Sequence, residues 1–253
     1  MFSTKLKNHI IKLHQKKYRK LYGEFVVEGF KSIDEALNKN AEVKFIVIEE
    51  NFSKTDKGAH IAKKADDKDI EIHTCNESDA GKIKSTVTYP GVSAVITQKI
   101  FSLKDLKNKN PIVALDKISD PGNLGTIIRT ADWFGYNNVL LSVDSVDPYN
   151  EKVVRSTMGS IFNTKLYISD NISKSIDSLK DDGYDIILLD TKGKDIDNLT
   201  MPKKAVYLFG SESHGISPEL EKIADKRYTI KGSGGAESLN VSVSAGIVLS
   251  KIK

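Results

Sequence analysis

Three short polar loops carry the residues of this chain that could do chemistry. They are DPGNLG at 120–125, GSESHG at 210–215 and KGSGGAESLN at 231–240. Each follows an apolar, β-rich run, and in an open parallel sheet ligands bind beyond the carboxyl ends of the strands. Glycines in such loops let the backbone approach a ligand closely, although they also relieve strain in ordinary tight turns. Three such loops at strand ends indicate a binding site more strongly than one would.

The second and third loops supply candidate catalytic groups. Glu212 places a carboxylate near Gly210, where the alternative is a loop salt bridge. His214 is a possible general base by residue type, although single histidines often only decorate a surface. Ser238 is expected to begin the final helix and could serve as its N-cap. Asn240 has no such routine role, because an asparagine inside a first helical turn neither packs nor caps.

A single arginine stands on the helix expected after the first loop. Apolar residues at helical spacing predict the buried stripe of this helix, which comprises Leu124, Ile127, Ile128, Ala131 and Phe134. At about 100° per residue, Arg129 falls about 160° from the centre of that stripe. Its face also carries Gly125, Asp132 and Trp133. A lone exposed arginine usually aids solubility, but Trp beside Arg is typical of interface cores. We therefore predict that this face meets another subunit or a substrate.

Residues 112–253 alternate short apolar runs with helical segments. This alternation predicts an α/β fold with a largely parallel sheet that helices cover on both faces. The expected strands are IVALDKI, NNVLLSV, TKLYIS, YDIILLD, AVYLFG and RYTI. The expected helices are one from Asn123, Glu151–Met158, Ser173–Asp182, SPELEKIAD and one from about Ser238.

The first part of the chain predicts a smaller α/β unit. Leu6, Ile10, Leu13 and Leu21 recur at near-helical spacing and predict an amphipathic first helix. A strand and a helix are expected in FVVEGFKSIDEAL, followed by strands in VKFIVIEE, EIHTC and GVSAVITQ. The segment FSLKDLKNKNP at 101–111 has the polar, Pro-ended composition of a linker. We therefore place one domain at 1–100 and another at 112–253.

Composition and charge narrow the function further. The net charge is only +4, but residues 1–22 contain Lys and Arg and no acidic residue, so this end could meet phosphate or could simply be a solvated face. No segment has the roughly 18 apolar residues of a membrane span, and a signal-peptide apolar stretch is absent, so a cytoplasmic protein without a membrane partner is expected. The single Cys75 gives no reason to expect a disulfide framework or a metal site. Conventional ATP and NAD motifs are absent.

The three loops resemble, in order and spacing, the signature motifs of the SpoU/TrmH family of RNA ribose 2′-O-methyltransferases, within the SPOUT superfamily. The similar segments are DPGNLGTIIRTADWFG, LFGSESHGI and IKGSGGAESLNVSVSAGI, with VDPYNEKVVRSTMGSIF between them. FVVEGFKSIDEAL resembles the opening of the family's RNA-binding domain, which is similar to ribosomal protein L30e. Ser213-His214 departs from the family's pattern, which often has a glycine after the glutamate. The resemblance implies an L30e-like domain followed by a SPOUT domain with a deep trefoil knot.

The resemblance also implies a cofactor, partners and site residues. The cofactor is S-adenosyl-L-methionine (AdoMet), and the family's sites lie at the interface of a homodimer, often with the arginine supplied by the partner subunit. Carried over by motif, the AdoMet contacts are Gly210, Ile230 and Leu239, with Thr191 as a further candidate. The matching active-site positions are Asn123, Arg129, Glu212, Ser238 and Asn240. Contacts to RNA are expected from Lys5, Lys12, Lys16 and Arg19.

The implied reaction is attack of a ribose 2′-hydroxyl on the AdoMet methyl group. A guanidinium keeps its charge in proteins, so we expect Arg129 to hold a phosphate and stabilise a developing alkoxide rather than to act as the base. Asn123, Ser238 and Asn240 would orient the ribose, and Glu212 would orient Arg129 or Asn123. The expected substrate is 23S ribosomal RNA, because the L30e-like module resembles the ribosomal members. Transfer RNA, base methylation and non-catalytic RNA binding are the alternatives.

Overall fold

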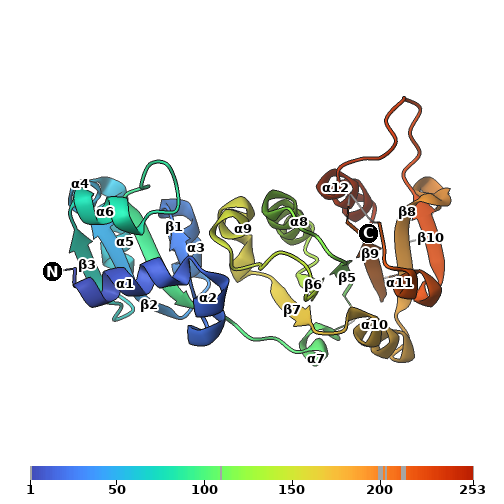
Figure 1. Cartoon of the computed structure of the whole chain (residues 1–253), viewed down its shortest axis with the longest axis horizontal. Coiled ribbons are helices and arrows are strands. Elements are labelled where there is room, and N and C mark those ends of the chain that lie inside the picture. Colours follow the sequence, from blue (N-terminus) through green and yellow to red (C-terminus); the bar gives the residue numbers. More distant parts are fainter. Residues whose placement is uncertain (1, 109, 199–201, 203, 212–214, 253) are drawn as a thin grey trace. The chain divides into compact units, whose positions relative to one another are not determined.

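The chain forms two α/β units, each built on its own sheet (Figure 1). The computed structural model describes residues 2–108, 110–198, 202, 204–211 and 215–252. The first unit comprises the residues up to Lys99 together with Asp147–Phe162, and the second unit comprises Ile100–Val146 and the chain from Asn163 onward. Residues 147–162, which sequence analysis assigns to the second domain, thus pack with the first unit.

The second unit is built on a six-stranded sheet whose neighbouring strands are all parallel. Its elements are α7 (Leu103–Leu106), β5 (Ile112–Leu115), α8 (Pro121–Trp133), β6 (Asn138–Ser142), β7 (Lys165–Ser169), α10 (Ile172–Asp181), β8 (Asp185–Asp195), η2 (Ile196–Asn198), β9 (Ala205–Phe209), α11 (Pro218–Ile223), β10 (Lys226–Thr229) and α12 (Val241–Lys251). The strand order is β10-β8-β9-β5-β6-β7. β5, β6 and β9 are buried at every residue. Figure 1 shows α8 and α12 on one side of the sheet and α7, α10 and α11 on the other. The predicted parallel sheet covered on both faces is therefore confirmed.

The parallel register brings the functional loops to one edge of this sheet. Leu115, the last residue of β5, pairs with Phe209, the last residue of β9, and Leu188 of β8 pairs with Leu208. The segments after β5 and β9 therefore leave the sheet at the same level, as expected for parallel strands. The trefoil knot that the resemblance implies stays a prediction.

The predicted linker contains a short helix anchored to the second unit. Ser102 and Asp105 form a capping box at the start of α7. Leu106 at the end of this helix is fully buried in the hydrophobic core, in one cluster with residues of β5, β6 and α10. One apolar side chain thus fixes an otherwise polar segment.

The first unit has a mixed four-stranded sheet in the order β1-β4-β2-β3. Its elements are α1 (Thr4–Leu13), α2 (Lys16–Tyr22), β1 (Glu24–Glu28), α3 (Phe30–Asn38), β2 (Val43–Glu49), α4 (Glu50–Ser53), α5 (Asp56–Asp66), β3 (Ile72–Cys75), α6 (Glu77–Ile83), β4 (Val92–Thr97), α9 (Glu151–Thr157) and η1 (Ser160–Phe162). β4 is antiparallel to β1 and β2, and β2 is parallel to β3. The four predicted strands are confirmed, whereas α4, α5 and α6 were not predicted. In the described part of the chain, no helix of either unit is long and apolar enough to cross a membrane.

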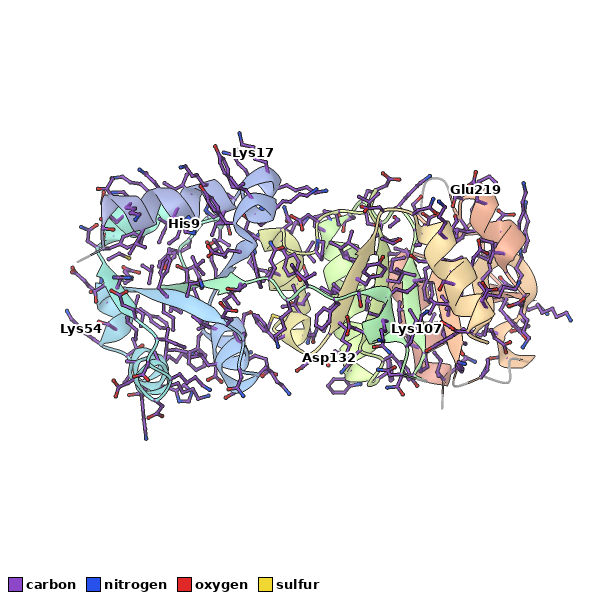
Figure 2. All side chains as sticks on the ribbon, turned by 90° about the horizontal axis from the view of Figure 1, so that it is seen from below. His9, Lys17, Lys54, Lys107, Asp132 and Glu219 are labelled. Carbon is purple, nitrogen blue, oxygen red and sulfur yellow. The ribbon has the colours of Figure 1, made fainter. Side chains whose placement is uncertain are left out.

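The basic first segment forms two helices, so the prediction of one amphipathic helix was wrong. Ile10 and Leu13 are buried as predicted, but α1 ends at Leu13. The chain turns before α2, and this turn changes which positions face inward, so Leu21 is 69% exposed. Figure 2 shows Lys17 at the outer surface of α2.

Arg19 takes an inward position on α2, which corrects its predicted role as an exposed RNA contact. Its side chain is only 3% exposed, and its guanidinium lies 2.7 Å from Asp147 and donates to the carbonyl of Leu13 over 2.9 Å. Lys5, Lys12 and Lys16, the other three predicted RNA contacts, are exposed. Arg19 therefore holds α2 to the segment that begins at Asp147.

A carboxylate one turn further along extends this buried ion pair. Glu151 lies 3.6 Å from Arg19 and 2.8 Å from Nδ1 of His14. Burial alone would raise the pKa of Glu151, but the hydrogen bond from His14 and the two neighbouring positive charges outweigh it and lower this pKa. Three elements, α1, α2 and α9, are thus joined through one polar cluster.

We expect Arg19→Leu to lower the free energy of unfolding by about 3 kcal/mol, because it leaves the half-buried Asp147 carboxylate without its cation and the Leu13 carbonyl without the Arg19 donor. Urea denaturation followed by circular dichroism would measure the change. Lys20→Leu on the same helix is the matched control, since Lys20 is exposed and should shift stability by about 0.5 kcal/mol or less. Equal midpoints for the two variants would contradict a structural role for Arg19.

Candidate active site

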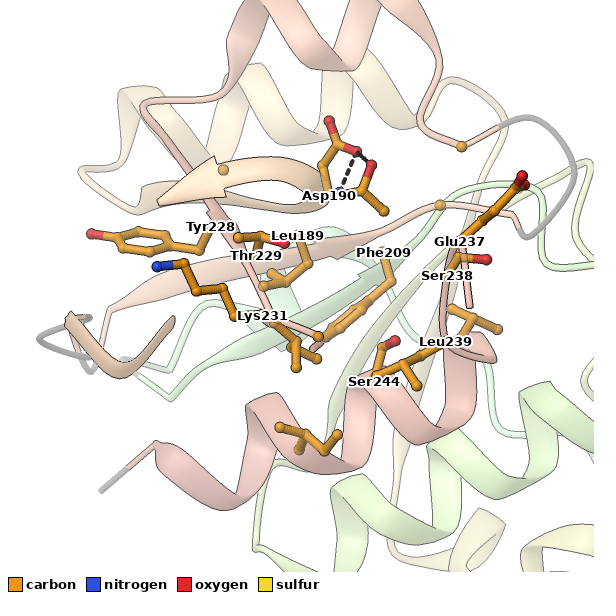
Figure 3. A pocket seen from close by; sticks show the side chains of 18 of the residues that line it. Leu189, Asp190, Phe209, Tyr228, Thr229, Lys231, Glu237, Ser238, Leu239 and Ser244 are labelled. Carbon is orange, nitrogen blue, oxygen red and sulfur yellow. Dashed lines mark hydrogen bonds between the residues drawn. The ribbon is translucent and has the colours of Figure 1, made fainter. Parts of the chain in front are cut away.

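A cavity of about 970 Å³ lies in the second unit, between the second half of β8, the carboxyl ends of β9 and β10, and the first turns of α12 (Figure 3). Its size is at the upper end of the usual range for small-molecule sites. The residues predicted to contact the cofactor all line it: Thr191, Gly210, Ile230 and Leu239. Ser238, a predicted active-site residue, lines it as well. The structure thus brings together positions that lie up to 48 residues apart in the sequence.

The cavity wall is largely apolar, with a few charged groups at its edge. Figure 3 shows Leu239 and Ser244 near the start of α12, Phe209 at the end of β9 with its ring toward that helix, and Asp190 and Tyr228 on the side of β8 and β10. The charged residues among those that line the cavity are Asp190, Lys231 and Glu237. Such a lining suits a ligand that has an apolar or aromatic part and cationic groups.

Asp190 forms a fixed part of this wall that sequence reasoning missed. Its Oδ1 accepts hydrogen bonds from the backbone N–H of Thr191 (2.5 Å) and from its hydroxyl (3.3 Å). Its Oδ2 accepts from Arg227 (3.1 Å), which also donates to Glu221 (2.9 Å). The signal was its place at the end of the apolar run YDIILLD. Asp190 therefore fixes the orientation of Thr191 against the cavity.

Two glycines are required by close backbone contacts around the cavity. A Cβ added at Gly210 would lie 2.3 Å from the carbonyl oxygen of Gly215, because Ser211 and Gly215 exchange backbone hydrogen bonds of 3.0 and 2.9 Å. A Cβ added at Gly193 would lie 2.4 Å from the carbonyl carbon of Tyr228. Any larger residue would push these strands and loops apart. Gly210 thus both closes a tight loop and lines the cavity.

Asn240 is the N-cap of α12, so the prediction that it does not cap was wrong. The helix begins after Asn240 and not at Ser238, which lies in the exposed loop before it. The Asn240 Oδ1 accepts from the backbone N–H of Ser242 (2.9 Å) and, more weakly, of Val243 (3.4 Å). Its Nδ2 donates to Oδ1 of Asn123 over 3.0 Å. One side chain therefore both caps a helix and joins two predicted site residues.

Asn123 lies in the first turn of α8, so the hydrogen bond to Asn240 brings two helix N-termini together. The N-cap of α8 is Asp120, which accepts from the backbone N–H of Asn123 over 2.8 Å. Further along the helices, a Cβ added at Gly246 of α12 would lie 3.8 Å from the methyl group of Thr130 on α8. Helix N-termini carry partial positive charge. The two asparagines therefore stand where negative charge on an oxygen would be stabilised.

The face of α8 that carries Arg129 is exposed, as predicted. Trp133 is 84% exposed, and Arg129 is exposed and does not line the cavity. Two details were wrong. Phe134 is 37% exposed because it is the C-cap, where the helical register ends, and Gly125, placed on the exposed face, is buried. An exposed arginine and tryptophan thus lie on the helix that also positions Asn123.

Glu212 and His214, predicted from the second loop, lie outside the described residues. The end of this segment is held by Asp116, a residue that sequence reasoning did not single out. Asp116 follows β5, is 1% exposed and accepts the backbone N–H of Ser217 through Oδ2 over 3.0 Å. Its Oδ1 is buried without a hydrogen-bond partner among the described residues. Its place at the end of the apolar run IVALD was the feature of the sequence that could have identified Asp116 as a candidate.

Comparison with known proteins identifies relatives of both units. Residues 110–250 match the SpoU rRNA methylase family, and residues 5–94 match the MRM3-like substrate binding domain. The 23S rRNA (guanosine(2553)-2′-O)-methyltransferase RlmP of Bacillus subtilis is 28% identical over 94% of this chain and 92% of its own length. The crystal structure of an AdoMet-bound rRNA methyltransferase from Sinorhizobium meliloti, 29% identical, superimposes with a TM-score of 0.86 and covers 98% of this chain and 95% of that one. Because the family match spans more than half of the sequence, this chain belongs to the SpoU rRNA methylase family.

Proposed function

We propose that this chain transfers a methyl group from AdoMet to a ribose 2′-hydroxyl of ribosomal RNA. The observation that carries the proposal is the cavity in which the motif-derived cofactor residues meet, together with the hydrogen bond between Asn240, the N-cap of α12, and Asn123 on α8. The Bacillus subtilis relative, which covers nearly the whole chain, has a name that specifies this reaction on 23S rRNA. Ribosomal RNA is therefore favoured over transfer RNA as the substrate.

The cavity fits AdoMet in size and in the chemistry of its lining. Phe209, Ile230 and Leu239 offer apolar surface to a purine ring, and the carboxylates of Asp190 and Glu237 carry the charge that would attract cationic groups. When bound, AdoMet supplies a methyl group that its positive sulfur already activates as an electrophile. The protein's task is then mainly to align the ribose oxygen with that methyl group.

The residues of this chain position the ribose and stabilise its oxygen. Asn240 is held by α12 and by Asn123, so its amide has a fixed direction, which is what a group that orients a hydroxyl needs. The N-termini of α8 and α12 favour the negative charge that develops as the hydroxyl loses its proton. The Arg129 guanidinium holds the neighbouring phosphate. For Glu212, orientation of Arg129 or Asn123 remains the prediction.

The active form in this proposal is a homodimer, in which Arg129 of one subunit completes the site of the other. The support is the exposure of Arg129 and Trp133 on α8, together with Val243, which is 50% exposed on the adjoining α12. An exposed apolar surface beside an arginine is typical of the centre of an interface. Arg129 is also absent from the cavity lining of its own chain.

The proposal is tested by transfer of labelled methyl from AdoMet to separate pools of unmodified ribosomal and transfer RNA, followed by digestion to nucleosides. A labelled 2′-O-methyl nucleoside from ribosomal RNA is the expected product. A labelled base would show a different reaction, and label only in transfer RNA would show a different substrate. Binding of RNA without any binding of AdoMet would favour a non-catalytic protein.

The Asn240→Asp variant separates the two roles of this side chain, which caps α12 through its oxygen and donates a hydrogen bond through its amide nitrogen. A carboxylate still accepts from the first N–H groups of α12, so the melting temperature should stay close to that of the unaltered protein. The amide donor is lost, so the rate of methyl transfer should fall by about 100-fold. Asn240→Ala is the control, because it removes both functions and should also cost about 1 kcal/mol of stability. A fully active Asn240→Asp variant would show that the amide is not needed.

Mixing two inactive variants tests whether Arg129 acts across the dimer. Arg129→Ala and Asn240→Ala should each be nearly inactive alone. In a mixed dimer, one site would combine the intact Arg129 of one subunit with the intact Asn240 of the other, so a refolded equal mixture should regain about a quarter of the activity. If both residues act within one subunit, mixing restores nothing.

A further inference from the structure

Helices α1 and α2 of the first unit expose a surface that combines stacked aromatic rings with lysines. This tyrosine surface comprises Lys12, Lys17, Tyr18 and Tyr22. The rings of Tyr18 and Tyr22 are within 12° of parallel, with their centroids 6.1 Å apart, and Tyr22 is 40% exposed. The ammonium groups of Lys17 and Lys12 lie 4.6 and 5.7 Å from the centroid of Tyr18. Aromatic faces and positive charges therefore occupy the same place.

The tyrosine surface is held in place from below. Arg19, between the two tyrosines in the sequence, points inward and is fixed by Asp147. The ring of His9 lies 4.9 Å from that of Tyr22, and Nε2 of His9 lies 2.6 Å from the Glu24 carboxylate. These contacts restrict the side chains before any partner arrives, which lowers the entropy cost of binding.

The lysines of this surface have no ion pair with any described residue. Among the other cations of the first 22 residues, Lys7 pairs with Asp79 at 2.9 Å and Arg19 is buried against Asp147. The lysines left without an acidic partner in the described ranges are Lys5, Lys12, Lys16, Lys17 and Lys20. Their uncompensated charge fits a polyanion.

We infer that the tyrosine surface stacks an unpaired base of the RNA substrate while its lysines hold the adjoining phosphates. This inference rests on the proposed function, which makes RNA the substrate. Lysines alone would serve any duplex, whose phosphates face outward and whose base faces are hidden. An exposed aromatic ring such as that of Tyr22 adds affinity only where a base is free to stack, as in a loop or a bulge. Leu21, 69% exposed on the same helix, adds apolar surface next to the rings.

Fluorescence anisotropy of the full-length protein with two RNAs would test this. One RNA is a hairpin with unpaired loop bases, the other is a perfect duplex of the same composition, and both are titrated over a series of KCl concentrations. Tyr22→Leu should weaken hairpin binding by about tenfold, leave duplex binding unchanged and leave the salt dependence unchanged. Tyr22→Phe is the matched control and should bind as the unaltered protein does. Lys17→Gln should weaken binding of both RNAs. It should also lower, by about one, the slope of the logarithm of the binding constant against the logarithm of the KCl concentration.

A second measurement needs no variant. A photoreactive 4-thiouridine at the unpaired position of the hairpin should cross-link to the peptide that contains Tyr18 and Tyr22. Cross-links confined to other peptides would overturn the inference, as would a Tyr22→Leu variant that binds the hairpin normally or loses the same factor on the duplex. If the Tyr22→Leu variant binds naked RNA normally but no longer methylates assembled ribosomal particles, the tyrosine surface contacts a protein partner instead of RNA.

Methyl transfer at saturating RNA keeps this inference separate from the proposed function. If Tyr22→Leu weakens hairpin binding but reaches the full rate at saturating RNA, both stand. A full rate with no effect of Tyr22→Leu on binding overturns only the role of the tyrosine surface. If Tyr22→Leu weakens hairpin binding but even the unaltered protein transfers no methyl group, only the proposed reaction is overturned.

Discussion

The hydrogen bond from Asn240 to Asn123 is the contact on which the proposed site depends. It joins the first turns of α8 and α12, two helices more than 100 residues apart in the sequence. α12 also forms one wall of the cavity through Val241, Ser244 and Ile247. A shift of α12 would therefore change the shape of this cavity and the direction of the two amides together. In the proposed site, cofactor binding and ribose positioning are thus coupled through the start of one helix, α12.

Sequence predicted the second unit well because its central strands are buried on both faces and form continuous apolar runs. The ends of β9 and β10 could be located from these runs, and Gly210 and Ile230 directly follow them. The end of β8 could not, because this strand continues to Asp195 beyond the apolar run YDIILLD, so Thr191 lies within it. Helix ends were harder. Whether a helix begins at Ser238 or after Asn240 depends on which side chain reaches the first free N–H groups, and one or two residues of sequence do not decide this.

The first unit was harder to predict because its important contacts are distant or weakly patterned. Arg19 looks like part of a cationic face, yet its partner Asp147 lies 128 residues later. No local pattern indicates such a pair. α5 has a polar sequence in which only Gly58, Ile61 and Ala65 are buried, so its periodicity is faint. Propensity and spacing describe a residue's neighbours in the chain, and these elements depend on neighbours in space.

The return of residues 147–162 to the first unit has a consequence for how the protein is made. The ion pair between Arg19 and Asp147 can form only after Asp147 has been synthesised. The same holds for the contact between the rings of Phe25 and Tyr149, whose centroids lie 4.8 Å apart. Domains usually fold from the N-terminus as the ribosome releases them. Here the N-terminal sheet emerges first, but its unit is completed by α9 and η1 only after β5, α8 and β6 have been synthesised. A fragment that stops near residue 100 would lack this last piece, so the N-terminal unit is not a freely transferable module.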